Sequence, residues 1–231
     1  MNIALLGYGK MGKTIERLAI QKGHHIVYKM GRELEEGDLS AADVAIEFSV
    51  PESAFQNIIT CFTQGIPVVS GTTGWLAQMD EVLKKCESSN GSFIYASNFS
   101  VGVNLFFSLN EKLAKLMEPW KEYEPRIDEI HHTQKLDAPS GTAITLAEGI
   151  LKHSDKKDWQ LDASNQDSLS IHAKRIDDVK GTHSVTYASK IDTITLKHEA
   201  HTREGFAMGA IIAAEWIQDK KGVFTMKDVL G

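Results

Sequence analysis

A run of twelve residues in the middle of the chain, from His131 to Thr142, carries the side chains best suited to chemistry. It opens with two adjacent histidines, His131 and His132, and Lys135 follows shortly after. Histidine titrates near neutral pH, so these imidazoles could transfer protons or bind an anion. The run closes with Ser-Gly-Thr at 140–142, a typical helix start, and a helix start binds anions through its free backbone N–H groups. The pattern predicts a site for a carboxylate substrate.

A glycine motif near the N-terminus predicts a second site. Residues 7–12 read Gly-Tyr-Gly-Lys-Met-Gly, the GxGxxG pattern. The motif follows a predicted strand over Asn2–Leu6 and opens a predicted helix over Lys10–Lys22, which is the context it requires. Its first glycine would allow a tight turn, its second the approach of a pyrophosphate, and its third the packing of helix on strand. We therefore expect a dinucleotide to be bound by Gly7, Tyr8, Gly9, Lys10, Met11 and Gly12.

The residues after the second predicted strand, His25–Met30, bear on which dinucleotide is bound. An acidic residue there favours NAD, whereas a basic one accommodates the 2′-phosphate of NADP. This chain has Lys29 and Arg32 at that point, and Glu33 comes only afterwards. The two charges favour NADPH, or the use of both NADPH and NADH. Alternatively, both are ordinary solvated charges.

Two further loops follow the predicted strands Pro67–Ser70 and Ser92–Ser97. Ligands of open α/β sheets bind beyond the carboxyl ends of the strands. Small hydroxyl side chains and backbone amides in these loops could hold the nicotinamide carboxamide. The residues concerned are Gly71, Thr72, Thr73, Ala96, Ser97, Asn98 and Phe99.

The elements that must position these residues fall into two groups. Up to about residue 97, strands alternate with helices, which is typical of a parallel sheet of the Rossmann type. Beyond it come a long helical pattern over Val101–Met117 and successive strands. Such successive strands predict a mixed sheet. We expect an α/β fold in which a nucleotide domain, 1–100 plus 205–231, receives an inserted α+β substrate domain, 101–204. Residues 152–167 are polar and predict a loop or a short irregular helix.

Composition excludes several classes of partner. The 231 residues carry a formal net charge of −6, which disfavours nucleic acid and anionic membranes. The N-terminus has no basic segment followed by a long apolar run, so neither a signal peptide nor a membrane span is expected. Cys61 and Cys86 are the only cysteines and neither belongs to a CxxC motif. We expect a reduced, cytoplasmic protein without a metal site.

The central run also has an ordinary structural interpretation. The two histidines could end a strand with one ring buried, Lys135 and Asp137 could form a surface pair, and Pro139 could simply introduce a helix. For an isolated His-His pair we would favour this interpretation. The density of acid–base groups beside a dinucleotide motif favours a catalytic site instead.

The sequence resembles the dihydrodipicolinate reductase family, also called 4-hydroxy-tetrahydrodipicolinate reductase. The resemblance spans nearly the whole chain. Its most specific part is Glu-Ile-His-His-Thr-Gln-Lys-Leu-Asp-Ala-Pro-Ser-Gly-Thr-Ala at 129–143, and further matches occur at 43–49, 71–74, 98–104 and 225–230. The glycine loop is shorter than in many members. Many members also have an acidic residue after the second strand, where this chain has Lys29 and Arg32.

The resemblance implies a function and a role for each site residue. Hydride would pass from NADPH or NADH to a cyclic dicarboxylate imine, giving tetrahydrodipicolinate in the diaminopimelate route of lysine biosynthesis. His131 and Lys135 would transfer protons, while His132, Gly141 and Thr142 would bind the substrate. The family also implies a homotetramer, built largely through the sheet of the inserted domain, 101–204, which is thus also the oligomerisation domain. The alternative is a catalytically silent, dinucleotide-sensing regulator of the same fold.

Overall fold

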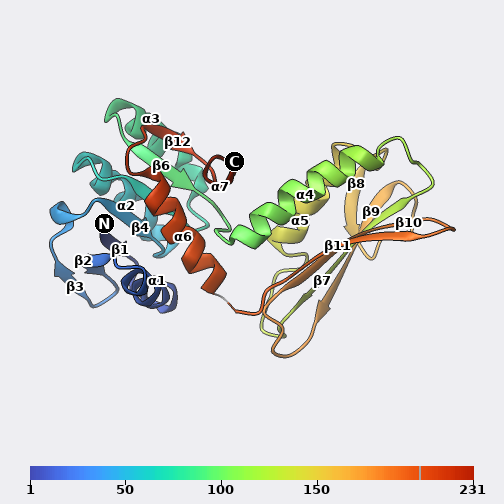
Figure 1. The fold of residues 1–231 in the computed structure, drawn as a ribbon, viewed down its shortest axis with the longest axis horizontal. Helices are drawn as coiled ribbons and strands as arrows, with labels where there is room; N and C mark the ends of the chain where they lie inside the picture. Colours follow the sequence, from blue (N-terminus) through green and yellow to red (C-terminus); the bar gives the residue numbers. More distant parts are fainter. Residues whose placement is uncertain (203) are drawn as a thin grey trace. The chain divides into compact units, whose positions relative to one another are not determined.

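The computed structural model describes residues 1–202 and 204–231. They divide into two compact units. The first unit comprises residues 1–101 and 204–231, and the second comprises residues 102–203. Each unit is built on its own sheet with helices packed against it (Figure 1).

The first unit contains a seven-stranded sheet in the order β12-β6-β5-β4-β1-β2-β3. Read from the other edge, the first six strands follow the order 3-2-1-4-5-6 of doubly wound dinucleotide-binding sheets. All neighbouring pairs are parallel except β2 and β3. The strands are β1 (Asn2–Leu6), β2 (His25–Met30), β3 (Glu35–Gly37), β4 (Val44–Glu47), β5 (Val68–Ser70), β6 (Ser92–Tyr95) and β12 (Gly222–Phe224).

Helices cover both faces of this sheet because its central strands bury side chains on both sides. Ile3 and Leu5 of β1 pack with α1 and α6, whereas Ala4 and Leu6 pack with α2 and α3. Such alternation of the side chains is a property of any strand. The helices are α1 (Lys10–Gln21), α2 (Pro51–Thr63), α3 (Met79–Ser88), α6 (Glu204–Ile217) and α7 (Met226–Leu230), with 3₁₀ turns at Leu39–Ala41 and Leu76–Gln78.

The second unit contains a five-stranded mixed sheet in the order β11-β10-β7-β9-β8. Strands β7, β9 and β8 run parallel, while β10 is antiparallel to both β7 and β11. Two helices, α4 (Val101–Met117) and α5 (Gly141–Leu151), contribute to the core against one face of the sheet. The strands are β7 (Glu124–His131), β8 (Asp158–Leu161), β9 (Ser168–Arg175), β10 (Thr182–Ala188) and β11 (Thr193–Glu199).

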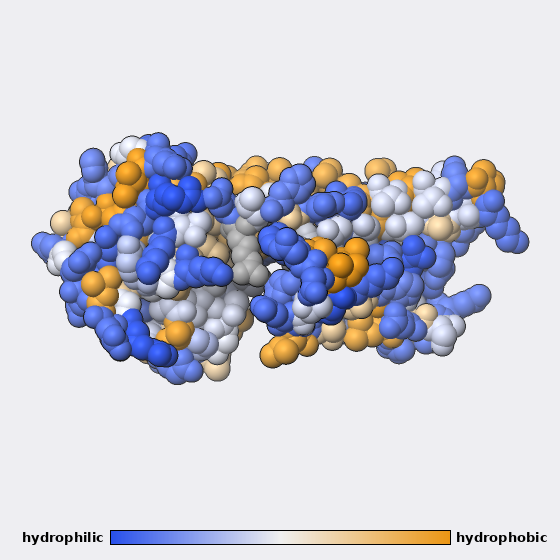
Figure 2. Space-filling model, turned by 90° about the horizontal axis from the view of Figure 1, so that it is seen from below, coloured by the Kyte–Doolittle hydropathy of each residue, from blue (hydrophilic) through white to orange (hydrophobic). Residues whose placement is uncertain are grey.

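Strand β7 divides its side chains between the covered and the open face of this sheet. Ile127, Glu129 and His131 are buried, whereas Arg126 is exposed and Asp128 is half-buried. The face of the protein shown in Figure 2 is largely hydrophilic, and its hydrophobic residues are scattered. A glutamate and a histidine at inward positions of a strand are unusual, since charged side chains are seldom fully buried unless paired.

The fold class predicted from the sequence is confirmed, with a parallel-strand sheet and a second, mixed one. Residues 152–167 differ from the prediction, because they contain β8, a strand on the edge of the mixed sheet. Its four residues pair with β9 and are mostly exposed, so the strand shows no hydrophobic alternation. The antiparallel strand β3 was not predicted either, because Glu35–Gly37 is wholly exposed.

The alternation of strands and helices predicts a helix over Trp75–Ser88, and the observed helix begins later than that. A 3₁₀ turn occupies Leu76–Gln78, and α3 starts at Met79. The Trp75 ring is buried, and its Nε1 donates a hydrogen bond of 2.7 Å to the carbonyl oxygen of Thr72. Among the described residues, no helix is both long and apolar enough to cross a bilayer.

Candidate functional site

The three glycines of the GxGxxG loop meet different constraints. Gly7 has φ +110°, and a Cβ there would lie 2.1 Å from the carbonyl oxygen of Phe48. A Cβ on Gly12 would lie 2.2 Å from the carbonyl oxygen of Gly7. Both glycines are therefore required by the protein's own backbone. Gly9 is exposed and a Cβ there would meet no atom within 4 Å, so its bare backbone is open to a ligand.

Gly9 is also the N-cap of α1, and no side chain caps this helix. The first backbone N–H groups of α1 are left for an anion, as in other dinucleotide-binding loops. Beside them lies a pocket of about 750 Å³, within the size range of small-molecule sites. Its lining is formed by Gly7, Tyr8, Gly9, Met30, Gly31, Arg32, Phe48, Ser49, Val50, Glu52, Ser53, Gln56 and Asn57.

The two basic residues predicted to face the ribose occupy different environments. Lys29 forms ion pairs with Glu16 at 2.7 Å and Glu36 at 3.3 Å, and its ammonium lies over the Tyr8 ring. The hydrogen bond to Glu16 holds the pKa of Lys29 above its usual range. Arg32 is exposed, lines the pocket and has no ion pair within the ranges 1–202 and 204–231. Arg32 is therefore the better placed of the two to receive a phosphate.

The loop after β5 is organised by a buried carboxylate. Glu47, at the end of β4, is fully buried and accepts hydrogen bonds from the hydroxyls of Ser49, Ser70 and Thr72. The Thr72 hydroxyl also accepts from the Ser49 amide at 2.8 Å. A Cβ on Gly71 would lie 2.3 Å from the Phe48 ring. Gly71 and Thr72 thus support the loop, and the predicted residue that stays exposed is Thr73.

The loop after β6 shows a similar division. Phe99 is buried, and a Cβ on Gly209 of α6 would lie 1.7 Å from its carbonyl oxygen. Asn98 accepts a hydrogen bond of 2.9 Å from the Ser100 amide through Oδ1. Ala96 donates its amide to the carbonyl of Ser70, which ties the loop to β5. Ser97 is exposed and follows the carboxyl end of β6. Nucleotides bind at that end of the strands in open α/β sheets.

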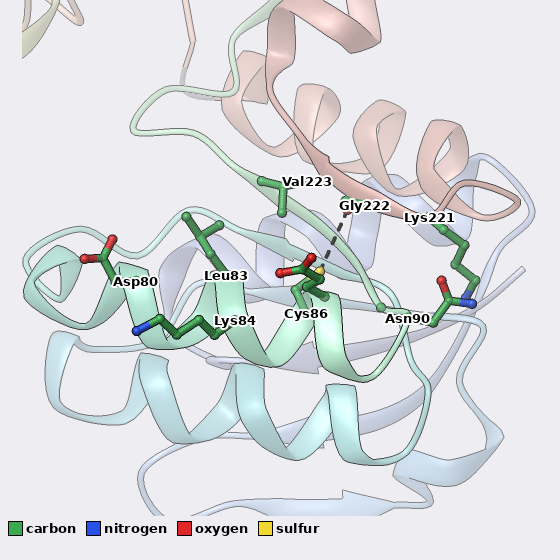
Figure 3. A pocket seen from close by; sticks show the side chains of 10 residues that line it. Asp80, Leu83, Lys84, Cys86, Asn90, Lys221, Gly222 and Val223 are labelled. Atoms are coloured by element: carbon green, nitrogen blue, oxygen red, sulfur yellow. Dashed lines mark hydrogen bonds between the residues drawn. The ribbon is translucent and has the colours of Figure 1, made fainter.

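A further pocket, of about 640 Å³, lies between α3 and β12 (Figure 3). It contains none of the predicted site residues. The Cys86 thiol contacts the carbonyl oxygen of Gly222 at 3.9 Å, and burial raises its pKa. The lining is formed by Asp80, Leu83, Lys84, Cys86, Glu87, Asn90, Gly91, Lys221, Gly222 and Val223.

In the second unit, sheet register gathers the central acid–base groups. Glu129 of β7 stands directly opposite His183 of the antiparallel strand β10. On the other side of β7, His131 is in register with Arg175 of the parallel strand β9. The rings of His131 and His183 meet edge to face, with centroids 4.9 Å apart. Three neighbouring strands therefore bring together residues that lie up to 54 positions apart, from Glu129 to His183.

Glu129 is the centre of this cluster and is fully buried. Both of its carboxylate oxygens accept hydrogen bonds from the amide of Ser140, at 3.2 and 3.1 Å. Arg175 donates to Oε1 at 3.2 Å. The Oε2 atom lies 3.5 Å from Nδ1 of His131 and 3.7 Å from Nε2 of His183. A buried charge is tolerated only with such partners.

These contacts set the protonation states of the cluster. Burial acts to raise the pKa of Glu129, but its contacts with His183 and Ser140 and the charge of His131 lower it to about 2. Burial lowers the pKa of His131 to about 4; the nearby charges of His183, Lys135 and Arg175 act in the same direction, against that of Glu129. At neutral pH the pair is therefore a carboxylate beside a neutral imidazole.

Glu129, His131 and His183 also offer ligand atoms that lie within 4.8 Å of one another, a spacing that could suit a metal ion. However, the Ser140 amide already occupies both carboxylate oxygens, and the Arg175 guanidinium would repel a cation. We therefore interpret the cluster as a hydrogen-bonding and proton-transfer site.

The loop after β7 carries Lys135, whose ammonium contacts both oxygens of Asp137 at 2.8 Å. The surface pair that the sequence suggested is therefore present. Arg175 holds this loop, because it donates to the carbonyl oxygens of Lys135 and Asp137. His132 is half-buried, and its carbonyl accepts from the amide of Lys135 at 3.1 Å.

The expected helix start is present at 140–142. Ser140 is the N-cap of α5, and its hydroxyl accepts from the amide of Ala143 at 3.2 Å. The same hydroxyl lies 3.1 Å from Nε2 of His183. Gly141 is exposed, Thr142 is half-buried, and a Cβ on Gly141 would meet no atom within 4 Å. The backbone of Gly141 is thus accessible to a carboxylate.

Sequence reasoning did not single out Glu129, Arg175 or His183. A signal existed for the first: Glu129 occupies an inward position in the alternation of β7. Arg175 and His183 carried no signal of this kind, because only the pairing of β9 and β10 with β7 brings them to the cluster.

Comparison with known proteins decides the family. A family model described as "Dihydrodipicolinate reductase, N-terminus" matches residues 1–99, and its C-terminal counterpart matches residues 102–230. The chain belongs to the dihydrodipicolinate reductase family. The resemblance identified from residues 129–143 is confirmed, and with it an oxidoreductase that uses NADPH or NADH.

Relatives of this family match the chain over its full length. A 4-hydroxy-tetrahydrodipicolinate reductase of Christiangramia forsetii is 57% identical, over 100% of this chain and 98% of its own. One from Archaeoglobus fulgidus is 33% identical over 100% of both chains. The solved dihydrodipicolinate reductase of Paenisporosarcina sp. TG-14, with dipicolinate bound, is 21% identical, covers 97% of both chains and has a TM-score of 0.79. The last likeness shows that the fold is shared.

Proposed function

We propose that this family member is a 4-hydroxy-tetrahydrodipicolinate reductase, which reduces a cyclic dicarboxylate imine to tetrahydrodipicolinate in the diaminopimelate route. The observation that carries the proposal is the cluster around Glu129. Glu129 contacts both His131 and the Ser140 amide at the start of helix α5. Arg175 contacts both Glu129 and the loop that carries Lys135. A proton-transfer group beside an anion-binding helix start suits a substrate that is both protonated and bound through carboxylates.

The first unit would hold the dinucleotide. The open backbone of Gly9 and the uncapped start of α1 fit a pyrophosphate. Arg32 at the edge of the pocket fits a 2′-phosphate, which favours NADPH over NADH. Lys29 plays a smaller part, since Glu16 and Glu36 already neutralise it. The exposed Thr73 and Ser97 remain candidates for the nicotinamide half.

The second unit would hold the substrate and move protons. The N–H group of Gly141 and the hydroxyl of Thr142 would bind one carboxylate at the start of α5, and His132 would contact the ring. The 4-hydroxy group would leave as water to give the unsaturated ring, and NADPH or NADH, when bound, would supply a hydride to that ring. The negative charge that results on the ring is neutralised by a proton from His131 or Lys135; general acid catalysis of this kind contributes about 10²–10⁴-fold.

Substrate binding would also set the charge of His131. In the ligand-free protein its pKa is lowered to about 4, so the ring is neutral at pH 7. Two substrate carboxylates nearby would raise this pKa, because a negative charge stabilises the imidazolium. His131 would therefore gain its proton together with the substrate, while the Lys135 ammonium is a second donor.

A silent regulator of the same fold is the competing function. It would bind a dinucleotide without turnover. The presence of His131, Lys135, Gly141 and Thr142 argues against it, because a regulator has no need of proton donors beside an anion site.

Assembly and location are part of the same proposal. We expect a homotetramer formed through the open face of the mixed sheet, whose edge strand β11 is exposed or half-buried along its length. Light scattering should give a particle four times the 25.6 kDa chain mass. The free thiols of Cys61 and Cys86 are both buried, which suits the reducing cytoplasm.

Turnover tests the function directly. The purified protein should oxidise NADPH only when freshly generated 4-hydroxy-tetrahydrodipicolinate is supplied. His131→Gln and Lys135→Ala should each lower kcat about 10²–10⁴-fold. Two surface residues serve as matched controls: His153, paired with Glu118, and Lys157, paired with Asp167. His153→Gln and Lys157→Ala should keep normal turnover. NADPH binding without turnover in the wild type would favour the regulator instead.

A further inference from the structure

Glu129 approaches His131 from one side of the imidazole only. Its Oε2 lies 3.5 Å from Nδ1, a charge contact rather than a hydrogen bond, and the buried Nδ1 has no hydrogen-bond partner among the described residues. Nε2 faces Gly181, where a Cβ would lie 3.3 Å away. A carboxylate beside Nδ1 favours the tautomer that carries its proton there, because the proton is attracted to the negative charge. Nε2 is then the atom that can accept and return a proton.

The other charged groups near His131 disfavour its protonation. His183 of β10, Arg175 of β9 and Lys135 of the following loop all act to lower the pKa of His131. Glu129 alone raises it among the causes that act on this ring. The Glu129 charge therefore attracts the proton to Nδ1 and favours the imidazolium, against the larger effect of burial.

The same carboxylate fixes the start of α5. It accepts the amide of Ser140 with both oxygens, and Ser140 directly precedes Gly141 and Thr142. The buried Glu129 carboxylate thus contacts both the proposed substrate-binding helix start and the proposed proton-transfer residue His131. Displacing that charge would disturb both at once, and errors of about 1 Å in such groups are costly to catalysis.

We propose that Glu129 is the positioning residue of the reductase site: it holds His131 in the Nδ1–H tautomer, with Nε2 available for proton transfer, and fixes the start of α5 for a substrate carboxylate. This inference rests on the proposed function, because it assigns to Glu129 the support of groups that are given catalytic and binding roles there. Glu129 is fully buried and acts through its neighbours.

Glu129→Gln is the decisive variant, since it keeps the size of the side chain and removes the charge. The side-chain amide can donate a proton toward Nδ1, which favours the Nε2–H tautomer of His131. The wrong tautomer in an acid–base histidine costs up to about 10⁴-fold in kcat. We expect a loss of about 10²–10⁴-fold in kcat, an increase in KM for the substrate, and an unchanged Kd for NADPH.

Nitrogen-15 NMR of histidine-labelled protein gives a readout that a merely structural role would not move. The His131 signals, identified by their loss in His131→Gln, should report the Nδ1–H tautomer in the wild type and Nε2–H in Glu129→Gln. Glu118→Gln is the matched control, because Glu118 also faces the Nδ1 of a histidine, His153 at 3.3 Å, but on the surface. It should leave kcat within about twofold of the wild type.

Three results would overturn the inference. The first is an Nε2–H tautomer of His131 in the wild type, which needs no variant and holds even if Glu129→Gln fails to fold. The second is an unchanged tautomer in a folded Glu129→Gln protein, and the third is a normal kcat in that protein. Absence of turnover by the wild type would instead refute the proposed function, and the NMR result would stand apart from it.

Discussion

The amide nitrogen of Ser140 lies 3.1 and 3.2 Å from the two carboxylate oxygens of Glu129, a residue eleven positions earlier in the chain. This contact anchors the start of α5 to the strand that carries His131. The residue after Ser140 is Gly141, which has no side chain and leaves its backbone N–H group accessible. A substitution at Gly141 can therefore test substrate binding without affecting the stability of the fold.

Gly141→Ala should fold normally and bind substrate poorly. A Cβ there meets no atom within 4 Å and the backbone is not in the left-handed region, so stability should be unchanged or rise by at most about 1 kcal/mol. A methyl group would obstruct a carboxylate at the N–H groups, and loss of a charged hydrogen bond costs about 1.5–3 kcal/mol. Steady-state kinetics should show KM for the substrate raised roughly 10–100-fold, with Kd for NADPH unaltered. An unchanged KM would place the carboxylate elsewhere.

Two glycines of the GxGxxG loop should differ in whether their substitution affects cofactor binding or stability. Gly9→Ala should retain the stability of the wild type and weaken NADPH binding at least tenfold, because its Cβ points into open space where a pyrophosphate would lie. Gly12→Ala should instead lower stability by about 1–3 kcal/mol, since its Cβ would lie 2.2 Å from the Gly7 carbonyl oxygen. Thermal unfolding and cofactor titration distinguish the two. Equal loss of stability in both variants would contradict the assignment of Gly9.

Much of this arrangement could be predicted from local patterns, and some could not. The strands Asn2–Leu6 and His25–Met30 and the helix Val101–Met117 have the predicted bounds, because each combines a strong apolar pattern with a clear end signal. By contrast, β8 and β3 depend on pairing with a neighbouring strand, since their own side chains are mostly exposed. Edge strands of this kind leave little trace in a single sequence.

Some residues of the candidate site could likewise be predicted from local sequence patterns, and others could not. His131 and Lys135 lie close in sequence and could be identified together. Arg175 and His183 reach the cluster only through the register of β9 and β10 with β7, which no local pattern encodes. Lys29 could be identified from its place after β2, but its ion pairs with Glu16 and Glu36 follow only from the fold.

Cofactor preference should follow Arg32 rather than Lys29. Arg32→Ala should raise Kd for NADPH roughly 10–100-fold and leave Kd for NADH nearly unchanged, because only NADPH carries the 2′-phosphate. Lys29→Ala should keep the ratio of the two constants, and its main effect should be a loss of about 1 kcal/mol in stability with the ion pairs to Glu16 and Glu36. Titration with both nucleotides provides the test. A ratio changed by Lys29→Ala and not by Arg32→Ala would reverse the assignment.

Stability should fall on mild acidification because of His131. Its pKa lies at about 4 in the folded protein against 6.5 ordinarily, so the unfolded chain takes up this proton first as pH falls. Stability is therefore lost between pH 6.5 and about 4, on the order of 2 kcal/mol over two pH units. Glu129, with its pKa lowered to about 2, adds a separate loss only below about pH 4.5. Urea unfolding at pH 7 and pH 5 should show a smaller loss in His131→Gln than in the wild type; equal losses would mean that His131 is not neutral in the folded state.

The central claim is hydride transfer to the substrate ring by this chain, and isotope transfer measures it most directly. The protein is incubated with NADPH deuterated at the transferable position of C4 and with freshly generated 4-hydroxy-tetrahydrodipicolinate, and the product is examined by mass spectrometry. We predict tetrahydrodipicolinate carrying one deuterium, formed in step with NADPH oxidation and lost in His131→Gln. Oxidation of NADPH without a labelled product, or no oxidation at all, would contradict the account.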